Sequence, residues 1–92
     1  MIRERGPAWD ASRHRVEQDA WEEHAAFMDG LADEGFVVLG GPLEGEERFM
    51  LVVDADSEDA VHARLAADPW TGMGLLRTAS VTPWEILLGE AR

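Results

Sequence analysis

The sequence contains no cysteine, no lysine and no long run of apolar residues. Without cysteine there is no disulfide framework, no zinc ribbon, no iron–sulfur cluster and no thiol nucleophile, a usage typical of the reducing cytosol. The roughly 18 consecutive apolar residues of a membrane span occur nowhere, and residues 1–10 lack the apolar segment of a secretory signal. We therefore expect a cytoplasmic protein that does not insert into a membrane.

Positive charge is also scarce. The 92 residues include 19 acidic side chains against 8 basic ones, all of them arginine, so the formal net charge is −11. Such a field repels phosphate backbones and anionic lipid headgroups, which argues against nucleic acids and membrane surfaces as partners. The 46% of hydrophobic residues, with four tryptophans, is too high for a disordered segment. The length allows one domain, residues 1–92, with a single core.

Residues 1–15 predict a short first strand and a mobile loop. Residues 2–4 can pair as a strand, whereas residues 5–15 contain glycine, proline, serine and aspartate without an apolar period, so Trp9 lies in a loop. The core of the domain is then expected over residues 16–88.

A helix is expected to follow, from about Val16. Apolar side chains recur there every three to four residues, and acidic side chains crowd the first turns, where the helix dipole favours them. Gly35 is a suitable residue to end this helix.

Two strands and a second helix come next. Residues 36–39 and 48–53 are apolar runs of strand type, and the connection over residues 43–47 predicts a hairpin, with Gly40 and Gly41 interpreted as turn glycines. Ser57 is the expected N-cap of a helix that runs to Ala67.

The end of the chain predicts a turn and a last strand. Pro69 stops the second helix, and residues 68–74 form a compact turn. Residues 75–88 read as one long extended segment, and Pro83 within it favours an edge strand or a bulge.

This order of elements predicts an α+β, ferredoxin-like βαββαβ sandwich, in which two helices cover one face of a four-stranded antiparallel sheet. We expect the other face to carry too many apolar side chains to meet water. Those side chains are Phe36, Val38, Phe49, Leu51, Val81 and Ile86. Pairing of two such faces into a homodimer follows.

Two residues stand out as candidates for chemistry. His24 lies at the edge of the apolar stripe of the first helix, one turn from Trp21 and one turn from Met28. Asp68 lies on the inward face of the second helix, at the end where the helix dipole disfavours a carboxylate. Each has an ordinary alternative: His24 as a half-buried imidazole bonded to a carbonyl, and Asp68 as the N-cap of a turn that begins with Pro69.

Together, His24 and Asp68 could act as a general base. A carboxylate bonded to one nitrogen of an imidazole fixes the tautomer and raises the basicity of the other nitrogen. A covalent hydrolase is not indicated, because no serine lies in a nucleophile elbow. His14 and His62 are expected in solvent.

Metal and nucleotide sites are not expected. No histidine spacing is that of a metal centre, and the glycines fit no phosphate-binding loop, so we expect no metal and no cofactor.

Several of these residues occur in an order that resembles the YCII-related (YciI-like) domain over residues 21–88. They are His24 in the first helix, Gly41 and Pro42 after a strand, and the turn Asp68, Pro69, Trp70. The resemblance implies a ferredoxin-like fold that pairs as a dimeric α/β barrel, with His24 and Asp68 at the centre of an active site. It also implies lyase or isomerase chemistry, because a related domain is associated with dehydrochlorination of a chlorinated hydroxyquinol.

The leading hypothesis is therefore a homodimer in which His24, oriented by Asp68, moves a proton on a small cyclic or aromatic molecule. That molecule would be held near Gly41, Pro42 and Trp70. The alternative is a non-catalytic ligand-binding or assembly module in which the pair of His24 and Asp68 is structural.

Overall fold

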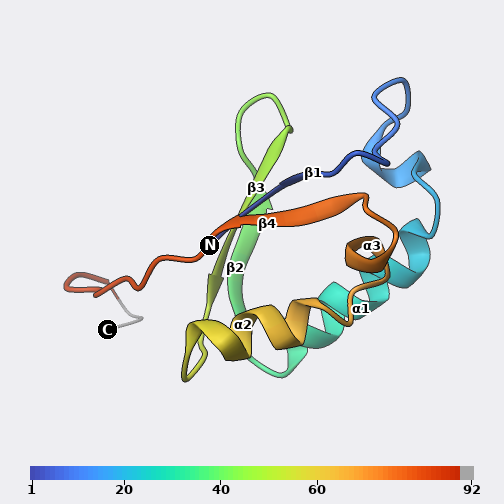
Figure 1. Ribbon diagram of the computed structural model, residues 1–92. Helices are drawn as coiled ribbons and strands as arrows, with labels where there is room; N and C mark the ends of the chain where they lie inside the picture. Colours follow the sequence, from blue (N-terminus) through green and yellow to red (C-terminus); the bar gives the residue numbers. More distant parts are fainter. Residues whose placement is uncertain (90–92) are drawn as a thin grey trace.

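The computed structural model describes residues 1–89, which form one antiparallel sheet and the helices beside it (Figure 1). The elements in chain order are β1 (Ile2–Arg5), the 3-10 turn η1 (Arg15–Glu17), α1 (Trp21–Asp33), β2 (Val37–Pro42), β3 (Arg48–Val53), α2 (Glu58–Leu65), α3 (Pro69–Gly72) and β4 (Leu76–Ser80). The strand order is β2-β3-β1-β4, and α1 and α2 lie against the same face. The predicted α+β, ferredoxin-like arrangement is confirmed.

The short first strand is confirmed and takes a central place in the sheet. β1 pairs with β3 on one side and with β4 on the other, so that Arg3 lies opposite Phe49 and Thr78. Its register against β4 shifts between Ile2 and Arg3. Because side chains alternate along a strand, Arg3 and Arg5 point to one face of the sheet and Glu4 to the other.

The core lies between the sheet and the helices, in two clusters. The first contains Leu31, Phe36, Leu51, Val61 and Leu65, and the second contains Trp70, Leu75 and Leu76, against which Trp9, Trp21 and Phe49 pack. The expectation that Phe36, Phe49 and Leu51 lie on the other face was therefore wrong. Alternation along β3 turns Phe49 and Leu51 toward the helices, and the exposed large apolar side chains of β2 and β3 are Val38, Leu39 and Met50.

The first helix begins later than predicted. Gln18 and Ala20 separate η1 from α1, and Ala20 has a φ of 58°, in the left-handed region, which interrupts the helix. The predicted end is confirmed, because Gly35 has a φ of 82° just past α1.

The hairpin is confirmed, but Gly40 and Gly41 lie within β2 and not in its turn. Gly40 is opposite Leu51, and a Cβ at this position would lie 2.6 Å from a methyl carbon of that leucine. The turn itself contains Gly45, whose φ is 87°.

The last strand is shorter than predicted. β4 ends at Ser80, so Pro83 lies beyond it and does not interrupt it. The predicted edge position is confirmed, because β4 is the last strand in the sheet order. The segment after β4 leaves the body of the molecule without further strand pairing up to residue 89 (Figure 1).

Candidate functional site

Asp68 occupies the junction between α2 and α3. Its backbone N–H donates to the carbonyl of Leu65, and its Oδ1 accepts the backbone N–H of Trp70 at 3.0 Å, which makes it the N-cap of α3. Pro69 follows at the first helical position, where its missing N–H costs nothing. The predicted capping role is thus confirmed, and the residue is only 1% exposed.

His24 reaches the same carboxylate from α1. Its Nδ1 lies 2.8 Å from Oδ1 and 3.0 Å from Oδ2 of Asp68, and the residue is 9% exposed. His24 lies one turn after Trp21 on the inward face of α1. Because α3 packs against this face, the imidazole reaches Asp68 at the start of α3. The contact between His24 and Asp68, which the sequence suggested but did not establish, is therefore present in the structure.

Arg3 is the third member of the cluster, and it comes from β1. Its Nη1 donates to Oδ2 of Asp68 at 2.7 Å, and its Nη2 donates to the hydroxyl of Thr71 at 2.6 Å. That hydroxyl in turn donates to the carbonyl of Leu65. With 2% of its surface exposed, Arg3 is a buried cation held against a buried anion.

These contacts set the charge of the carboxylate. Burial by itself raises the pKa of Asp68, but hydrogen bonds from His24 and Arg3 outweigh it, so the pKa lies below its ordinary value. An ionised carboxylate only accepts hydrogen bonds, which assigns the Nδ1 hydrogen to His24. In the neutral form of this ring the lone pair is on Nε2, which makes no hydrogen bond with any residue from 1 to 89.

Aromatic rings fix the plane of the imidazole. The ring of Trp70 stacks on that of His24 with a centroid separation of 3.8 Å and an interplanar angle of 5°. Trp70 is itself anchored, because its Nε1 donates to the carbonyl of Asp19 at 2.7 Å. The ring of Trp21, one turn earlier on α1, lies 6.0 Å from the imidazole, so two tryptophan rings flank His24.

The remaining predicted residues are placed apart from this cluster. Gly41 and Pro42 lie on β2, opposite Met50 and Phe49, and no hydrogen bond or ring contact within the described chain links them to His24 or Asp68. His14 and His62 are exposed, as predicted.

The sequence interpretation did not include Arg3. One signal for Arg3 was available in the sequence. Residues 3 and 5 of a strand lie on the same face, so two arginines at these positions could have indicated a buried basic group.

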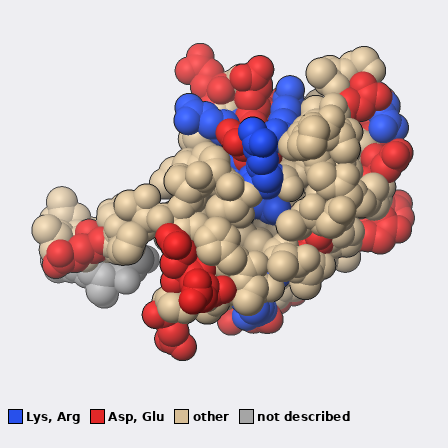
Figure 2. Space-filling model, in the orientation of Figure 1, with Lys and Arg blue, Asp and Glu red and all other residues tan. Residues whose placement is uncertain are grey.

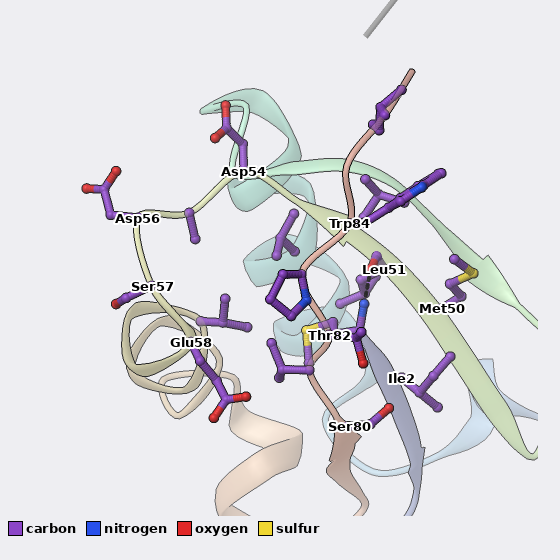
Figure 3. A pocket seen from close by; sticks show the side chains of 18 residues that line it. Ile2, Met50, Leu51, Asp54, Asp56, Ser57, Glu58, Ser80, Thr82 and Trp84 are labelled. Carbon is purple, nitrogen blue, oxygen red and sulfur yellow. Dashed lines mark hydrogen bonds between the residues drawn. The ribbon is translucent and has the colours of Figure 1, made fainter. Parts of the chain in front are cut away.

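A hollow lies elsewhere on the molecule (Figure 3). It has a volume of about 680 Å³ and is bounded by the start of β1, the end of β3, the beginning of α2 and the segment after β4. Its walls are mostly apolar, and Asp54, Asp56 and Glu58 stand along its rim. Neither His24 nor Asp68 lines it.

Charge is distributed unevenly over the surface. Acidic side chains predominate, while basic ones gather in the middle of one view, over β1 and β4 (Figure 2). Within residues 1–89, no three acidic or histidine side chains are placed to hold a metal ion. The same residues include no helix with the length and apolar character needed to cross a bilayer.

Comparison with known families supports the resemblance seen in the sequence. A family model described as the YCII-related domain matches residues 7–85, which is most of the chain. None of the curated proteins matches the sequence. The family match begins after β1, so it does not extend to Arg3.

Proposed function

The chain belongs to the YCII-related domain family, and we propose that its His24 is a general base that moves a proton on a small molecule while Asp68 positions the imidazole. The observation that supports this most is the contrast between the two ring nitrogens. Nδ1 is bound to a buried carboxylate, whereas Nε2 makes no hydrogen bond within the described residues. An imidazole held in this tautomer is ready to accept a proton at Nε2.

The carboxylate contributes through its charge and its rigidity. When Nε2 accepts a proton, the imidazolium that forms lies against Asp68, whose ionised form is maintained by Arg3 and by the backbone of Trp70. A positioned base of this kind contributes roughly 10²- to 10⁴-fold to a reaction rate. Asp68 is therefore a positioning residue, and His24 is the group that touches the substrate.

Lyase or isomerase chemistry fits this arrangement. In an elimination, a C–H bond breaks, its proton goes to Nε2, its electron pair forms the new double bond, and the leaving group departs with its own pair. In an isomerisation the same proton returns to another carbon. A cyclic or aromatic substrate suits the half-buried ring of Trp21, which lies 6.0 Å from the imidazole.

The test is turnover of small lactones and halogenated hydroxyquinols by the wild type and by His24→Gln. We expect turnover of one of these classes, lost at least 100-fold in His24→Gln and reduced in Asp68→Asn. His62→Gln is the matched control, because His62 is exposed on α2. Full turnover by a folded His24→Gln variant would contradict the proposal.

A second candidate is a non-catalytic binding module. The observation that favours it is the hollow of about 680 Å³, which is large enough for a small ligand and which His24 does not line. Under this alternative the cluster of Arg3, His24 and Asp68 only holds helices and sheet together. A compound that raises the melting temperature, is not chemically changed, and still binds His24→Gln would favour this second function.

We also propose that two copies associate through the open face of the sheet. Leu39, which is 68% exposed, and Met50, which is 40% exposed, lie on neighbouring strands there. Apolar side chains gathered on one sheet face are typical of an interface. A homodimer is also what the resemblance to the YCII-related domain implies.

A further inference from the structure

Three buried N–H donors near the cluster of Arg3, His24 and Asp68 have no acceptor among the described residues. They are Nε of Arg3, Nε of Arg5 and Nε1 of Trp9. A buried donor without an acceptor costs roughly 1–3 kcal/mol, and in folded proteins such groups are usually paired with protein, water or an ion. Three such donors in one region are therefore available to an acceptor from outside the chain, either water or a ligand.

The three donors come from one corner of the fold. Arg3 and Arg5 are two residues apart on β1, so both point to the side that faces the helices. The guanidinium carbon of Arg5 lies 4.9 Å from the ring centroid of Trp9. The Trp9 ring also lies 6.3 Å from Phe49, which is the β3 residue opposite Arg3. Trp9 belongs to the loop of residues 6–14, in which the backbone N–H groups of Gly6 and Ala8 donate to the carbonyls of Leu75 and Gly74.

The charge of this corner is positive and unbalanced. The carboxylate of Asp68 already accepts hydrogen bonds from His24, Arg3 and Trp70, so it does not balance the charge of Arg5. Arg5 makes no side-chain hydrogen bond or ion pair with any residue from 1 to 89, although the chain has 19 acidic side chains. Its guanidinium instead lies over the ring of Trp9.

Four other arginines have acidic partners, whereas Arg48, which also makes no ion pair within residues 1–89, is exposed. Arg15 is paired with Glu46, Arg64 with Glu34, and Arg77 with Glu4. Arg13 is paired with Asp10 and Asp19. A half-buried guanidinium left unpaired in so acidic a chain is poised for an anion from outside.

We propose that Arg5, Trp9 Nε1 and Arg3 Nε form a binding position for a small carboxylate beside the pair of His24 and Asp68. The two oxygens of a carboxylate accept hydrogen bonds in one plane. One carboxylate can therefore accept from the guanidinium N–H groups of Arg5 and from an indole N–H as well. Its single negative charge matches the half-buried guanidinium of Arg5, which makes no ion pair within residues 1–89. The apolar body of such a molecule would lie against Trp9 and Phe49.

This position is independent of the proton transfer proposed for His24. If both are present, the substrate is a carboxylate-bearing cyclic compound, and binding is measured without any turnover. Failure of anion binding would leave the His24 chemistry standing, and failure of turnover would leave the anion position standing.

The experiment follows the indole N–H resonances by NMR during a titration with sodium formate and sodium acetate. Ionic strength is held constant with sodium chloride, over roughly 1 to 100 mM carboxylate, because a single charge-assisted site for a monoanion is weak. We expect a saturable shift of the Trp9 indole N–H. The Trp70 indole N–H, which is bound to the carbonyl of Asp19, should stay in place as an internal control.

Variants identify the donors. Trp9→Phe retains a ring, removes the N–H and assigns the resonance, and Arg5→Gln should weaken binding at least tenfold. Arg77→Gln is the matched control, because Arg77 is exposed and paired with Glu4, and it should bind like the wild type.

Two results would overturn the proposal. One is a Trp9 resonance that does not move with carboxylate and shows exchange only with water, since the donors would then be hydrated and nothing more. The other is a shift that persists unchanged in a folded Arg5→Gln variant. Because the wild-type titration stands by itself, loss of folding in a variant does not remove the test.

Discussion

The Nδ1 atom of His24 lies 2.8 Å from Oδ1 of Asp68, a residue 44 positions further along the chain. The other oxygen of that carboxylate accepts a hydrogen bond from Arg3, which is 65 positions away. One buried carboxylate thus connects α1, β1 and the junction of α2 with α3. Changes at Asp68 should therefore act on the imidazole and on stability together, and the two effects can be separated by experiment.

Replacing Asp68 should alter the imidazole signals of one histidine only. Asp68→Asn removes the carboxylate that lies 2.8 Å from Nδ1 of His24, so the ring nitrogen resonances of His24 should shift at a fixed pH. Those of His14 and His62, which are exposed, should not shift. If the ring nitrogen resonances of all three histidines are the same in the wild type and the variant, His24 and Asp68 are not in contact in solution.

The stability of the protein should fall in acid through Asp68. Because the pKa of the folded carboxyl lies below the ordinary value of 3.8, the folded state binds fewer protons than the unfolded state there. The stabilisation is fully present above the unfolded pKa and is lost as the pH falls through the folded pKa. Urea unfolding between about pH 6 and pH 2 should show this loss in the wild type.

Two variants test that assignment. Asp68→Asn should be less stable at neutral pH and should lose less further stability in acid. Asp54→Asn, at an exposed position on the rim of the hollow, should follow the wild-type curve. An acid transition that is equally steep in Asp68→Asn would mean that other carboxylates cause it.

Removing the guanidinium of Arg3 should be costly. Arg3→Met leaves Asp68 buried with only part of its compensation, and breaking a buried pair in this way costs about 3–5 kcal/mol of unfolding free energy. The double variant Arg3→Met/Asp68→Asn should recover part of that loss, because neither charge then remains unpaired. Arg77→Met, at the surface, should change stability by less than about 1 kcal/mol. An equally small effect of Arg3→Met would show that the buried pair does not stabilise the fold.

Association should depend on the open face of the sheet and on salt. Light scattering after size-exclusion chromatography should give the mass of a dimer for the wild type and of a monomer for Met50→Glu. Because each copy carries a charge of −11, repulsion opposes pairing, and added salt should strengthen the dimer by screening. Glu44→Gln, in the exposed β2–β3 turn, is the control. A wild type that is monomeric at high protein and salt concentration would rule out this surface as an interface.

Local signals accounted for the elements that the sequence predicted well. Ser57 caps α2 through a hydrogen bond to the backbone N–H of Ala60, and Gly35 ends α1 in the left-handed conformation. Caps and breakers act within a few residues, so their effect can be recognised without knowing the rest of the fold. His24 and Asp68 could be singled out for the same reason, each as an unusual polar residue on an apolar helix face.

Features set by long-range pairing were predicted less well. Which face of β3 is inward depends on its register against β1, and that register placed Phe49 and Leu51 toward the helices. Arg3 was missed because a charged residue near the start of a chain is ordinarily exposed, and only the central position of β1 buries it. The end of β4 at Ser80 likewise reflects where β1 stops offering partners, since Ile2 pairs with Ser80.

The central place of β1 has a consequence for the order of events during synthesis. β1 is synthesised before both of its neighbours in the sheet, β3 and β4, and Arg3 is synthesised 65 residues before Asp68, whose carboxylate it binds. Contacts so distant in sequence close slowly and together. In a nascent chain that ends before Asp68, Arg3 has no carboxylate to bind when it is buried. The contacts of His24 and Arg3 with Asp68 and the sheet around β1 should therefore form in one cooperative step, after Asp68 and β4 have been synthesised.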